Sequence, residues 1–525
     1  MADDVRVRPD PSGAPGRRPG GRRRRPGDGP RPAPPDQPPV PRPRYPFEPV
    51  RAVSEDQLEA IHLASLRVLT ETGMDFLHPE ARRLWREAGA DVDGARVRPD
   101  PELVLDLVGR APARFTLHAR NPERSLDIGG DAVVFGAVAS APNVTDRAGG
   151  RRPGSRADFA DLVRLSHRLN AIHLHGGYPV EPVDLHPSVR HLHATLDLLT
   201  LSDKPVHGYS LGADRNRDCL EMVRIARGID DETLEAEPSI FSVINSSSPL
   251  RLDTPMLEGI LQLSARNQVI ILTPFTLAGA MAPVTVAGAL VQQNAEALAG
   301  VAFTQLVRAG SPVVYGGFTS NVDMQSGSPA FGTPEFMTAA LVGGQLARRY
   351  GLPYRSSNVC AANTVDTQAG YESVFSLWGA VMGGANIVFH GAGWLEGGLQ
   401  ASFEKMVVDA DLLQMVATFL RPLVVDDATL AVEAIAEVGP GGHFFGVGHT
   451  RERFRDAFHR PMVSDWRNHE SWTEAGRPTT FDHAEAAVAR LLDGYEQPVL
   501  AREIRQELDE FVTRRVAEGG AATDY

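Results

Sequence analysis

The sequence predicts an α/β protein: a (β/α)8 TIM barrel with an N-terminal helical lead-in and a C-terminal helical appendage. Eight short apolar runs of strand character recur along the chain, and successive runs start 29–44 residues apart. Segments of helical periodicity lie between these runs. Gly or Pro stands at or just beyond many of the run ends, which leaves room for a ligand to approach the backbone. A doubly wound open sheet is the alternative, but it rarely contains eight evenly spaced units.

Four segments follow from this pattern. Residues 1–45 are rich in Pro, Arg and Gly, and they cannot bury enough apolar surface to offset the entropy of ordering, so we expect a disordered tail. We leave open whether this tail binds an acidic partner, serves as a linker or reflects a misplaced start codon. Residues 46–130 form the lead-in, residues 131–420 the barrel that carries the active site, and residues 421–525 the appendage.

The lead-in is predicted to begin with a helix capped by Ser54, because acidic residues follow Ser54 and apolar residues recur on one helical face. Further helices are expected near 79–88 and 101–109. A short β segment is expected within 114–128.

The barrel strands are predicted from their apolar runs. They begin near Ala132, Ile172, Pro205, Ser239, Gln268, Pro312, Pro353 and Asn386. The intervening helices are expected at 158–169, 254–266, 285–308, 334–350 and 371–382, followed by 402–419 after the last strand and by 482–492 and 501–516 in the appendage.

Composition excludes several classes of protein. The net charge of −13 argues against a nucleic-acid-binding body. The sequence contains no uninterrupted run of 18 apolar residues, so we expect no membrane span. It has no apolar region near its start, so we expect no signal peptide. The two cysteines, Cys219 and Cys360, exclude a disulfide framework. We therefore expect a cytoplasmic protein without membrane or nucleic-acid partners.

Aromatic residues cluster on or just after the predicted strand ends, where parallel α/β proteins bind ligands. They are Tyr178, Tyr209, Phe275, Tyr315, Phe318, Tyr354, Phe389 and Trp394. Several aromatic faces around one cavity hold a quaternary ammonium group by cation–π attraction. Only one face of each strand points inward, so we expect three or four of these rings to line the cavity.

A metal-dependent hydrolase is a less favoured alternative. His173 and His175 stand on the same side of a predicted strand, as in the metal pair of amidohydrolases. His207 and His390 are the candidates to join them, but no strand-end Lys, Asp or later His pair completes a three-ligand site. We predict no bound metal.

A set of short motifs in a fixed order resembles the trimethylamine methyltransferase family, in particular its members without pyrrolysine. The resemblance covers about residues 47–515. The motifs are residues 245–250 (NSSSPL), 274–283, 294–300 (NAEALAG), Gln305, 334–335, 366–372 (DTQAGYE), 384–386, 402–404, 408–409 and 449–450.

The resemblance implies a TIM barrel that moves a methyl group from an amine to the cobalt(I) of a corrinoid. The corrinoid signature Asp-x-His-x-x-Gly is absent, because Val189 stands where Gly is needed after Asp184 and His186. No cofactor is therefore expected to be permanently bound, and a cognate corrinoid protein is expected to present cobalamin. The absence of pyrrolysine shifts the expected substrate from a tertiary methylamine to a quaternary amine such as glycine betaine.

The candidate site residues follow from the strand ends and the resemblance. The catalytic candidates are His390 and Glu372. The substrate-binding candidates are Tyr178, His207, Asn245, Phe275, Tyr315, Phe318, Arg355, Asn358, Asp366, Gln368, Trp394 and Glu396. A betaine carboxylate needs donors, for which His390, Arg355 and the two asparagines are suited, whereas Glu372 and Glu396 could face the cation. A non-catalytic amine-binding protein is the second hypothesis, and a homo-oligomer is left open.

Overall fold

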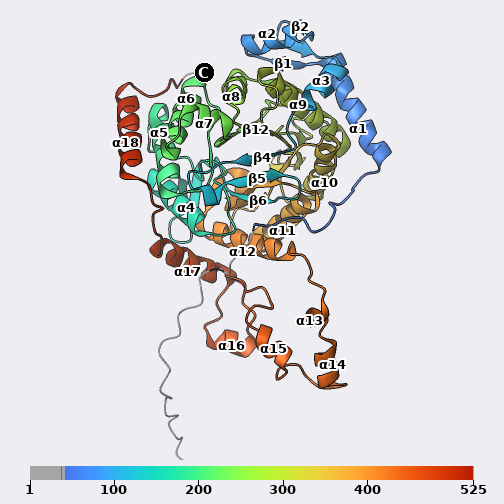
Figure 1. Cartoon of the computed structure of the whole chain (residues 1–525), viewed down its shortest axis with the longest axis vertical. Helices are drawn as coiled ribbons and strands as arrows, with labels where there is room; N and C mark the ends of the chain where they lie inside the picture. The colour runs from blue at the N-terminus through green and yellow to red at the C-terminus, as the bar shows by residue number, and fades with distance from the viewer. Residues whose placement is uncertain (1–36, 38–41, 524–525) are drawn as a thin grey trace, which may run out of the picture. The chain divides into compact units, whose positions relative to one another are not determined.

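The computed structural model describes residue 37 and residues 42–523 (Figure 1). Most of the predicted disordered tail, residues 1–45, lies outside the described residues. Its last residues pack against the barrel. The Tyr45 hydroxyl donates a hydrogen bond to the Ala385 carbonyl at 2.8 Å, and Arg44 forms a β-bridge with Ala132. The predicted tail is therefore too long at its C-terminal end.

Seven parallel strands form the main sheet, in the order β6-β18-β17-β14-β12-β10-β9. They are β6 (Val134–Ala137), β9 (Val206–His207), β10 (Ile240–Ile244), β12 (Val269–Leu272), β14 (Val313–Gly316), β17 (Tyr354–Ser357) and β18 (Ile387–Ala392). The remaining predicted strand, around residues 172–175, is the second along the chain and lies between β6 and β9. Leu174 bridges Gly136 of β6, and the His175 N–H donates to the Pro205 carbonyl at 3.0 Å.

The pairing of β18 with β6 joins the last strand unit to the first. The sheet therefore closes on itself, which confirms the predicted barrel and excludes the open sheet. Eight helices follow the strand units. They are α4 (Arg156–Arg168), α5 (Pro187–Leu201), α6 (Ala213–Arg227), α8 (Thr254–Ala265), α9 (Val286–Val307), α10 (Pro334–Arg349), α11 (Thr367–Met382) and α12 (Phe403–Phe419).

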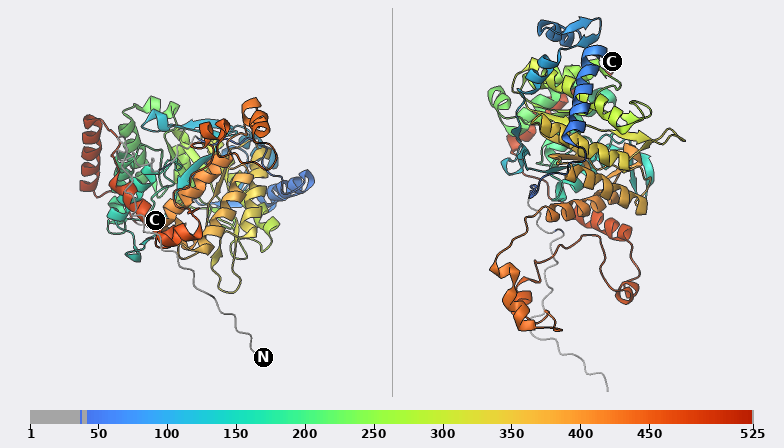
Figure 2. Two further views of the ribbon diagram at one scale, coloured as in Figure 1. Left: turned by 90° about the horizontal axis from the view of Figure 1, so that it is seen from below. Right: turned by 90° about the vertical axis from the view of Figure 1, so that its right-hand side faces the viewer.

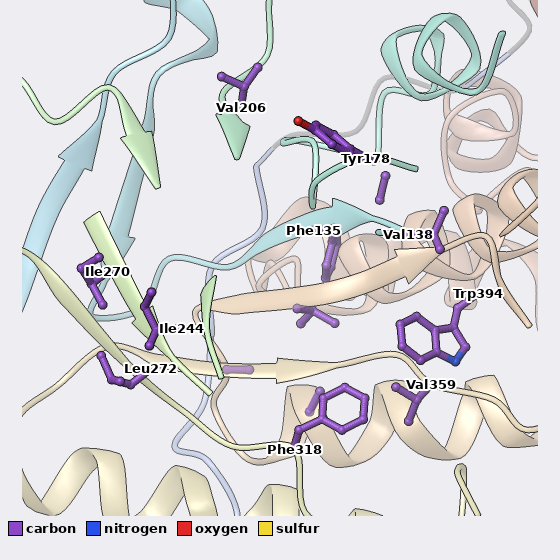
Figure 3. Close-up of a cluster of buried hydrophobic side chains, with 14 of the residues drawn as sticks. Phe135, Val138, Tyr178, Val206, Ile244, Ile270, Leu272, Phe318, Val359 and Trp394 are labelled. Carbon is purple, nitrogen blue, oxygen red and sulfur yellow. The ribbon is translucent and has the colours of Figure 1, made fainter. Parts of the chain in front are cut away.

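Alternation along each strand separates two apolar layers. Along β12, Val269 and Ile271 belong to the cluster inside the barrel. Ile270 and Leu272, which Figure 3 labels, belong to the larger cluster that includes the surrounding helices. The hairpin of β4 (Arg114–Leu117) and β5 (Leu126–Gly129) adds apolar side chains to the interior cluster. This hairpin closes the end where the strands begin, so a ligand has to enter from the opposite end, which we call the mouth.

The loops at the mouth form two small sheets. One contains β13 (Leu277–Ala278), β15 (Ser320–Val322) and β16 (Pro329–Ala330). The other contains β7 (Asn143–Asp146), β8 (Gly150–Pro153), β19 (Trp394–Leu395) and β20 (Gln400–Ser402). Both place backbone and side chains around the ends of the barrel strands.

The flanking segments pack on the outside of the barrel. In the lead-in, α1 (Glu55–Arg67) and α3 (Pro101–Val108) pack on α9, and α2 (Pro79–Glu87) lies between them in sequence. Ser54 caps α1 through a capping box with Gln57, as its sequence predicts. In the appendage, α17 (Thr480–Asp493) packs on α12 and α18 (Arg502–Ala517) on α5. Among the described helices, none is both long and apolar enough to span a bilayer.

Candidate active site

An aromatic group gathers at the mouth, where β14 and β18 end. The His390 and Trp394 ring centroids lie 4.0 Å apart. Phe318 lies 6.1 Å from Trp394 and 5.1 Å from Phe275, measured between ring centroids. Phe318 follows β14 and Trp394 follows β18, with β17 between these two strands (Figure 3). Four of the predicted residues are therefore brought together by the fold.

Arg355 enters this group from β17, and only 2% of it is exposed. Its guanidinium carbon lies 5.3 Å from the Phe318 ring centroid and 5.1 Å from the Phe389 ring centroid. One terminal nitrogen donates to the Gly317 carbonyl at 3.3 Å, but Nε has no partner. Burial lowers the pKa of Arg355 to about 9, and no carboxylate opposes this shift. Arg355 is thus a buried cation whose charge is not neutralised by the described residues.

Two glycines at the end of β14 leave room for polar side chains. A methyl group on Gly316 would lie 3.0 Å from Thr273 Oγ1 and 3.3 Å from Arg355 Cδ, and one on Gly317 would lie 2.2 Å from the Gln293 amide. Gln293 reaches this position from α9 and accepts a hydrogen bond from Thr319 at 2.6 Å. Gly316 therefore leaves room for Thr273 beside Arg355, and Gly317 leaves room for Gln293.

The mouth concentrates buried polar atoms that have no hydrogen-bond partner among the described residues. They are His207 Nδ1, Thr273 Oγ1, Gln293 Nε2, Arg355 Nε, Ser357 Oγ, Asn358 Oδ1, His390 Nδ1 and Trp394 Nε1. Buried polar groups of folded proteins almost always form hydrogen bonds, because a buried donor or acceptor without a partner costs about 1–3 kcal/mol. Such a concentration at the strand ends indicates that these groups serve a polar ligand.

The two histidines of this set are uncharged at neutral pH. The Val243 N–H donates to His207 Nε2 at 3.0 Å, which makes Nδ1 the protonated nitrogen of the neutral ring. Burial lowers the pKa of His207 to about 3. Burial, and then the charges of Arg355 and His207, hold the pKa of His390 well below its usual range. A neutral imidazole donates one hydrogen bond without adding a second positive charge beside Arg355.

Tyr178 lies in a different place from the Arg355 group. It lines a side cavity of about 190 Å³ between the second strand unit, α5 and α6, together with Glu181, Arg190 and Tyr209. The Tyr209 ring lies 4.5 Å from the Tyr178 ring and 4.3 Å from the His207 ring, centroid to centroid. Tyr209 therefore separates Tyr178 from the mouth.

The prediction that Tyr315 lines the site is wrong. Its neighbour Val314 points into the barrel, so Tyr315 points outward, and its hydroxyl donates to Asn294 Oδ1 of α9 at 2.9 Å. The same alternation turns His173 and His175 outward, because Leu174 belongs to the interior cluster. The two histidines proposed as ligands of a metal-dependent hydrolase therefore do not point into the barrel. Within the described part of the chain, no three His, Cys, Asp or Glu side chains gather as a metal site would.

Glu372 does not face the mouth as predicted. Its carboxylate accepts hydrogen bonds from the backbone N–H groups of Ala361 and Ala362, at 2.8 and 3.0 Å, and from Gln368 Nε2 at 2.8 Å. Asp366 caps α11 by accepting from the Ala369 N–H at 3.1 Å. Glu372, Gln368 and Asp366 therefore stabilise the loop after β17 and the start of α11, where acidic side chains accept hydrogen bonds from backbone N–H groups.

Two other predicted residues lie at the rim, and one lies in the group. Asn245 is exposed after β10. Glu396 accepts from Arg151 Nε at 2.8 Å, so an arginine of the β7–β8 hairpin already neutralises its charge. Asn358 is 1% exposed, and its Nδ2 donates to the Gly391 carbonyl at 3.0 Å, which leaves its Oδ1 unpartnered. Asn358 therefore belongs to the site and Glu396 to the loop that covers it.

Several residues of the group were missed from the sequence. Thr273 and Ser357 lie two positions after the inward-facing Ile271 and Arg355, so strand alternation could have identified them. Gln293 lies inside a helix and carries no local signal. Phe331 reaches the group from the loop before α10, with its ring centroid 5.4 Å from that of Phe318.

Comparisons with known proteins find similar chains among methyltransferases. The family model for trimethylamine methyltransferase (MTTB) matches residues 17–520. The chain is 36% identical over 469 residues to the glycine betaine methyltransferase of Desulfitobacterium hafniense (strain Y51), covering 89% of this chain and 98% of the relative. It is 28% identical over 475 residues to the trimethylamine methyltransferase MttB of Desulfitobacterium hafniense (strain DSM 10664 / DCB-2), covering 89% and 95%. The solved hydroxylamine complex of MtmB shares the fold, with a TM-score of 0.50, 12% identity and 88% coverage of each chain.

Proposed function

The chain belongs to the trimethylamine methyltransferase family, and from this premise we propose that it demethylates a quaternary amine that carries a carboxylate, of the glycine betaine type. The methyl group passes to the cobalt(I) of a separate corrinoid protein. The bond between nitrogen and carbon breaks, a bond between cobalt and carbon forms, and the amine leaves as a neutral tertiary amine.

The observation that carries the proposal is the unpaired Arg355. A buried cation without a counter-ion is costly, and a carboxylate on the substrate would supply that counter-ion. A methylated cation that lacks a carboxylate would instead meet like-charge repulsion from the guanidinium. Arg355 therefore favours a zwitterionic betaine over tetramethylammonium or protonated trimethylamine.

The aromatic group suits the other end of the same molecule. The faces of Phe275, Phe318 and Trp394 attract a quaternary ammonium group by about 0.5–2 kcal/mol per ring. Neutral His390 and Asn358 stand beside Arg355 as further polar partners of the ligand. The chain positions the cation and excludes water, and no general acid is needed because the leaving amine is neutral.

The corrinoid protein has to reach the same mouth, because the hairpin of β4 and β5 closes the other end. Five of the loops that surround the mouth expose a large apolar side chain. These side chains are Val183, Leu211, Val284, Met324 and Leu399. Exposed apolar side chains grouped around a site mark an interaction surface. We assign this ring to the docking of the corrinoid protein.

Methyl transfer to the cognate corrinoid protein, reduced to cobalt(I), tests the proposal directly. The visible spectrum is followed with glycine betaine, other betaines, choline, tetramethylammonium and trimethylamine. We expect methyl-cobalt formation with a betaine and at least about 100-fold slower transfer with compounds lacking a carboxylate, as loss of a charge partner costs about 2–5 kcal/mol. Transfer that ignores the carboxylate would overturn the substrate assignment. Betaine binding without transfer would indicate a silent binding protein.

A further inference from the structure

The appendage contains a segment that leaves the barrel. We call residues 421–461 the arm. It begins after α12 and ends where the Met462 N–H donates to Asp411 at 2.8 Å. It carries three short helices, α13 (Asp427–Leu430), α14 (Val432–Val438) and α15 (Gly448–Arg453). Figures 1 and 2 show these helices standing away from the barrel. Ala434 and Val447 are the buried residues of this described segment.

The arm is rich in large apolar side chains that face solvent. They are Leu423, Val424, Val425, Leu430, Val432, Ile435, Phe444, Phe445, Phe454 and Phe458. Phe445 is 88% exposed and Phe458 is 82% exposed. So many exposed large apolar side chains on one segment are rare on a protein that works as a monomer. The arm therefore needs a surface to cover it.

The same chain also presents an uncovered apolar face on its barrel. We call it the α11 face, formed by Tyr371, Val374 and Trp378 of α11 and by Met415 and Phe419 of α12, all exposed. The Trp378 and Phe419 ring centroids lie 5.3 Å apart, so the two helices present one surface. The solvent side of a barrel helix is normally charged. The single charged residue of α11, Glu372, is buried.

We propose that the arm of one copy packs on the α11 face of a second copy of this chain, and that the second arm packs on the first copy in return. Each chain carries one arm and one α11 face. A reciprocal exchange around a two-fold axis therefore covers both arms and both α11 faces of a dimer. The absence of exposed charge on the α11 face suits the apolar start of the arm, from Leu423 to Val425.

The position of the arm argues against the corrinoid protein as the occupant. Barrel helices run back from the mouth, so the end of α12 and the start of the arm lie at the strand-start end. Phe419 packs there against Phe47, with ring centroids 5.8 Å apart. The corrinoid protein has to work at the opposite end. The inference thus does not depend on the reaction proposed above.

The size of the surface is sufficient for a stable dimer. Aromatic side chains bury about 150–250 Å² each, so the four phenylalanines of each arm could cover on the order of 1,000 Å² in two exchanged arms. The aliphatic side chains add to this area. Specific interfaces bury about 1,200–2,000 Å² in total.

Oligomeric state provides the first test. Light scattering on the full chain after gel filtration is expected to give twice the chain mass or an even multiple. A variant with Phe445→Ser and Phe458→Ser is expected to raise the apparent dissociation constant of the dimer at least about tenfold, since such anchors dominate interfaces. Both side chains face solvent in one copy, so the folded monomer should tolerate the change. Val499→Ser, at a position 92% exposed outside both surfaces, is the matched control.

Cross-linking provides the second test and identifies the surfaces. Both native cysteines are buried, so introduced cysteines react selectively. One preparation carries Trp378→Cys with an affinity tag, and another carries Phe445→Cys without a tag. After mixing and subunit exchange, a short bis-maleimide is expected to join tagged to untagged chains. A monomeric wild-type chain, an oligomer unchanged by the double serine variant, or no cross-link between tagged and untagged chains after exchange would each overturn the proposal.

Discussion

The imidazole of His390 and the indole of Trp394 lie 4.0 Å apart between ring centroids, and each ring has a buried nitrogen without a partner. Both rings border the loop where β18 ends, and His390 has a φ of 52°. A non-glycine residue with positive φ is uncommon and is often held by surrounding structure at functional sites. The pair therefore forms the centre of the candidate site.

Trp394→Leu tests the aromatic wall. We expect kcat/KM for betaine to fall about 10- to 30-fold, because the strongest of the π faces around the cation is removed. Trp466→Leu is the matched control, since Trp466 is 72% exposed in the appendage. An equal loss in both variants, or no loss in Trp394→Leu, would contradict the assignment. Steady-state methylation of the corrinoid protein measures the effect.

Arg355→Met tests the carboxylate partner through stability as well as activity. Transfer from betaine should fall at least about 100-fold, since a charge-assisted pair is lost. The free energy of unfolding of the ligand-free enzyme should rise by about 1–3 kcal/mol, because replacing an unpaired buried charge by an apolar side chain removes its desolvation cost. Methylation of the corrinoid protein measures the transfer, and thermal unfolding of the ligand-free enzyme measures the stability. A destabilised variant that still discriminates betaine from choline would contradict this role.

Glu372→Ala tests the corrected role of the predicted catalytic acid. Two backbone N–H groups, of Ala361 and Ala362, would lose their acceptor, so the free energy of unfolding should fall by about 1–3 kcal/mol. Glu372→Gln retains an acceptor oxygen and should recover part of this stability. We expect kcat/KM of folded Glu372→Gln to stay within about threefold of wild type. Loss of turnover in a fully stable Glu372→Gln would restore the catalytic prediction.

His173 makes stability depend on pH. Burial, and then nearby cations, lower its pKa from 6.5 to about 3 in the folded chain. The unfolded chain therefore binds more protons between these values, and stability is lost as pH falls from about 6.5 toward 3. At pH 5 the loss is on the order of 1–2 kcal/mol relative to pH 7. Urea unfolding should show a shallower pH dependence in His173→Asn, with unchanged activity at pH 7 because His173 faces away from the mouth.

Met324→Glu combined with Val284→Glu tests the docking ring. These side chains are 70% and 68% exposed on loops at the mouth, so the fold should be unaffected. We expect KM for the corrinoid protein to rise about tenfold and KM for the amine to stay constant, because only the protein partner contacts the ring. Val499→Glu serves as the control. Equal changes in both KM values would count against a docking role.

The barrel, its eight strand units, the helices between them and the end of the sheet that carries the candidate site could all be predicted from the sequence. These follow from periodicity, turn residues and spacing, which are local properties. Phe275, Phe318, Trp394, Arg355, Asn358 and His390 were candidates because all lie close to the end of a strand.

The folded chain was needed to show which side chains point into the candidate site and which buried polar atoms lack hydrogen-bond partners. Tyr315 turns outward because the frame of β14 places Val314 inside. Glu372 is engaged because the loop at Ala361 folds back over α11. Arg355 stays without a counter-ion because no carboxylate of the described residues reaches it. The facing of a side chain depends on register and on partners far away in the chain, and neither is encoded in a short stretch of residues.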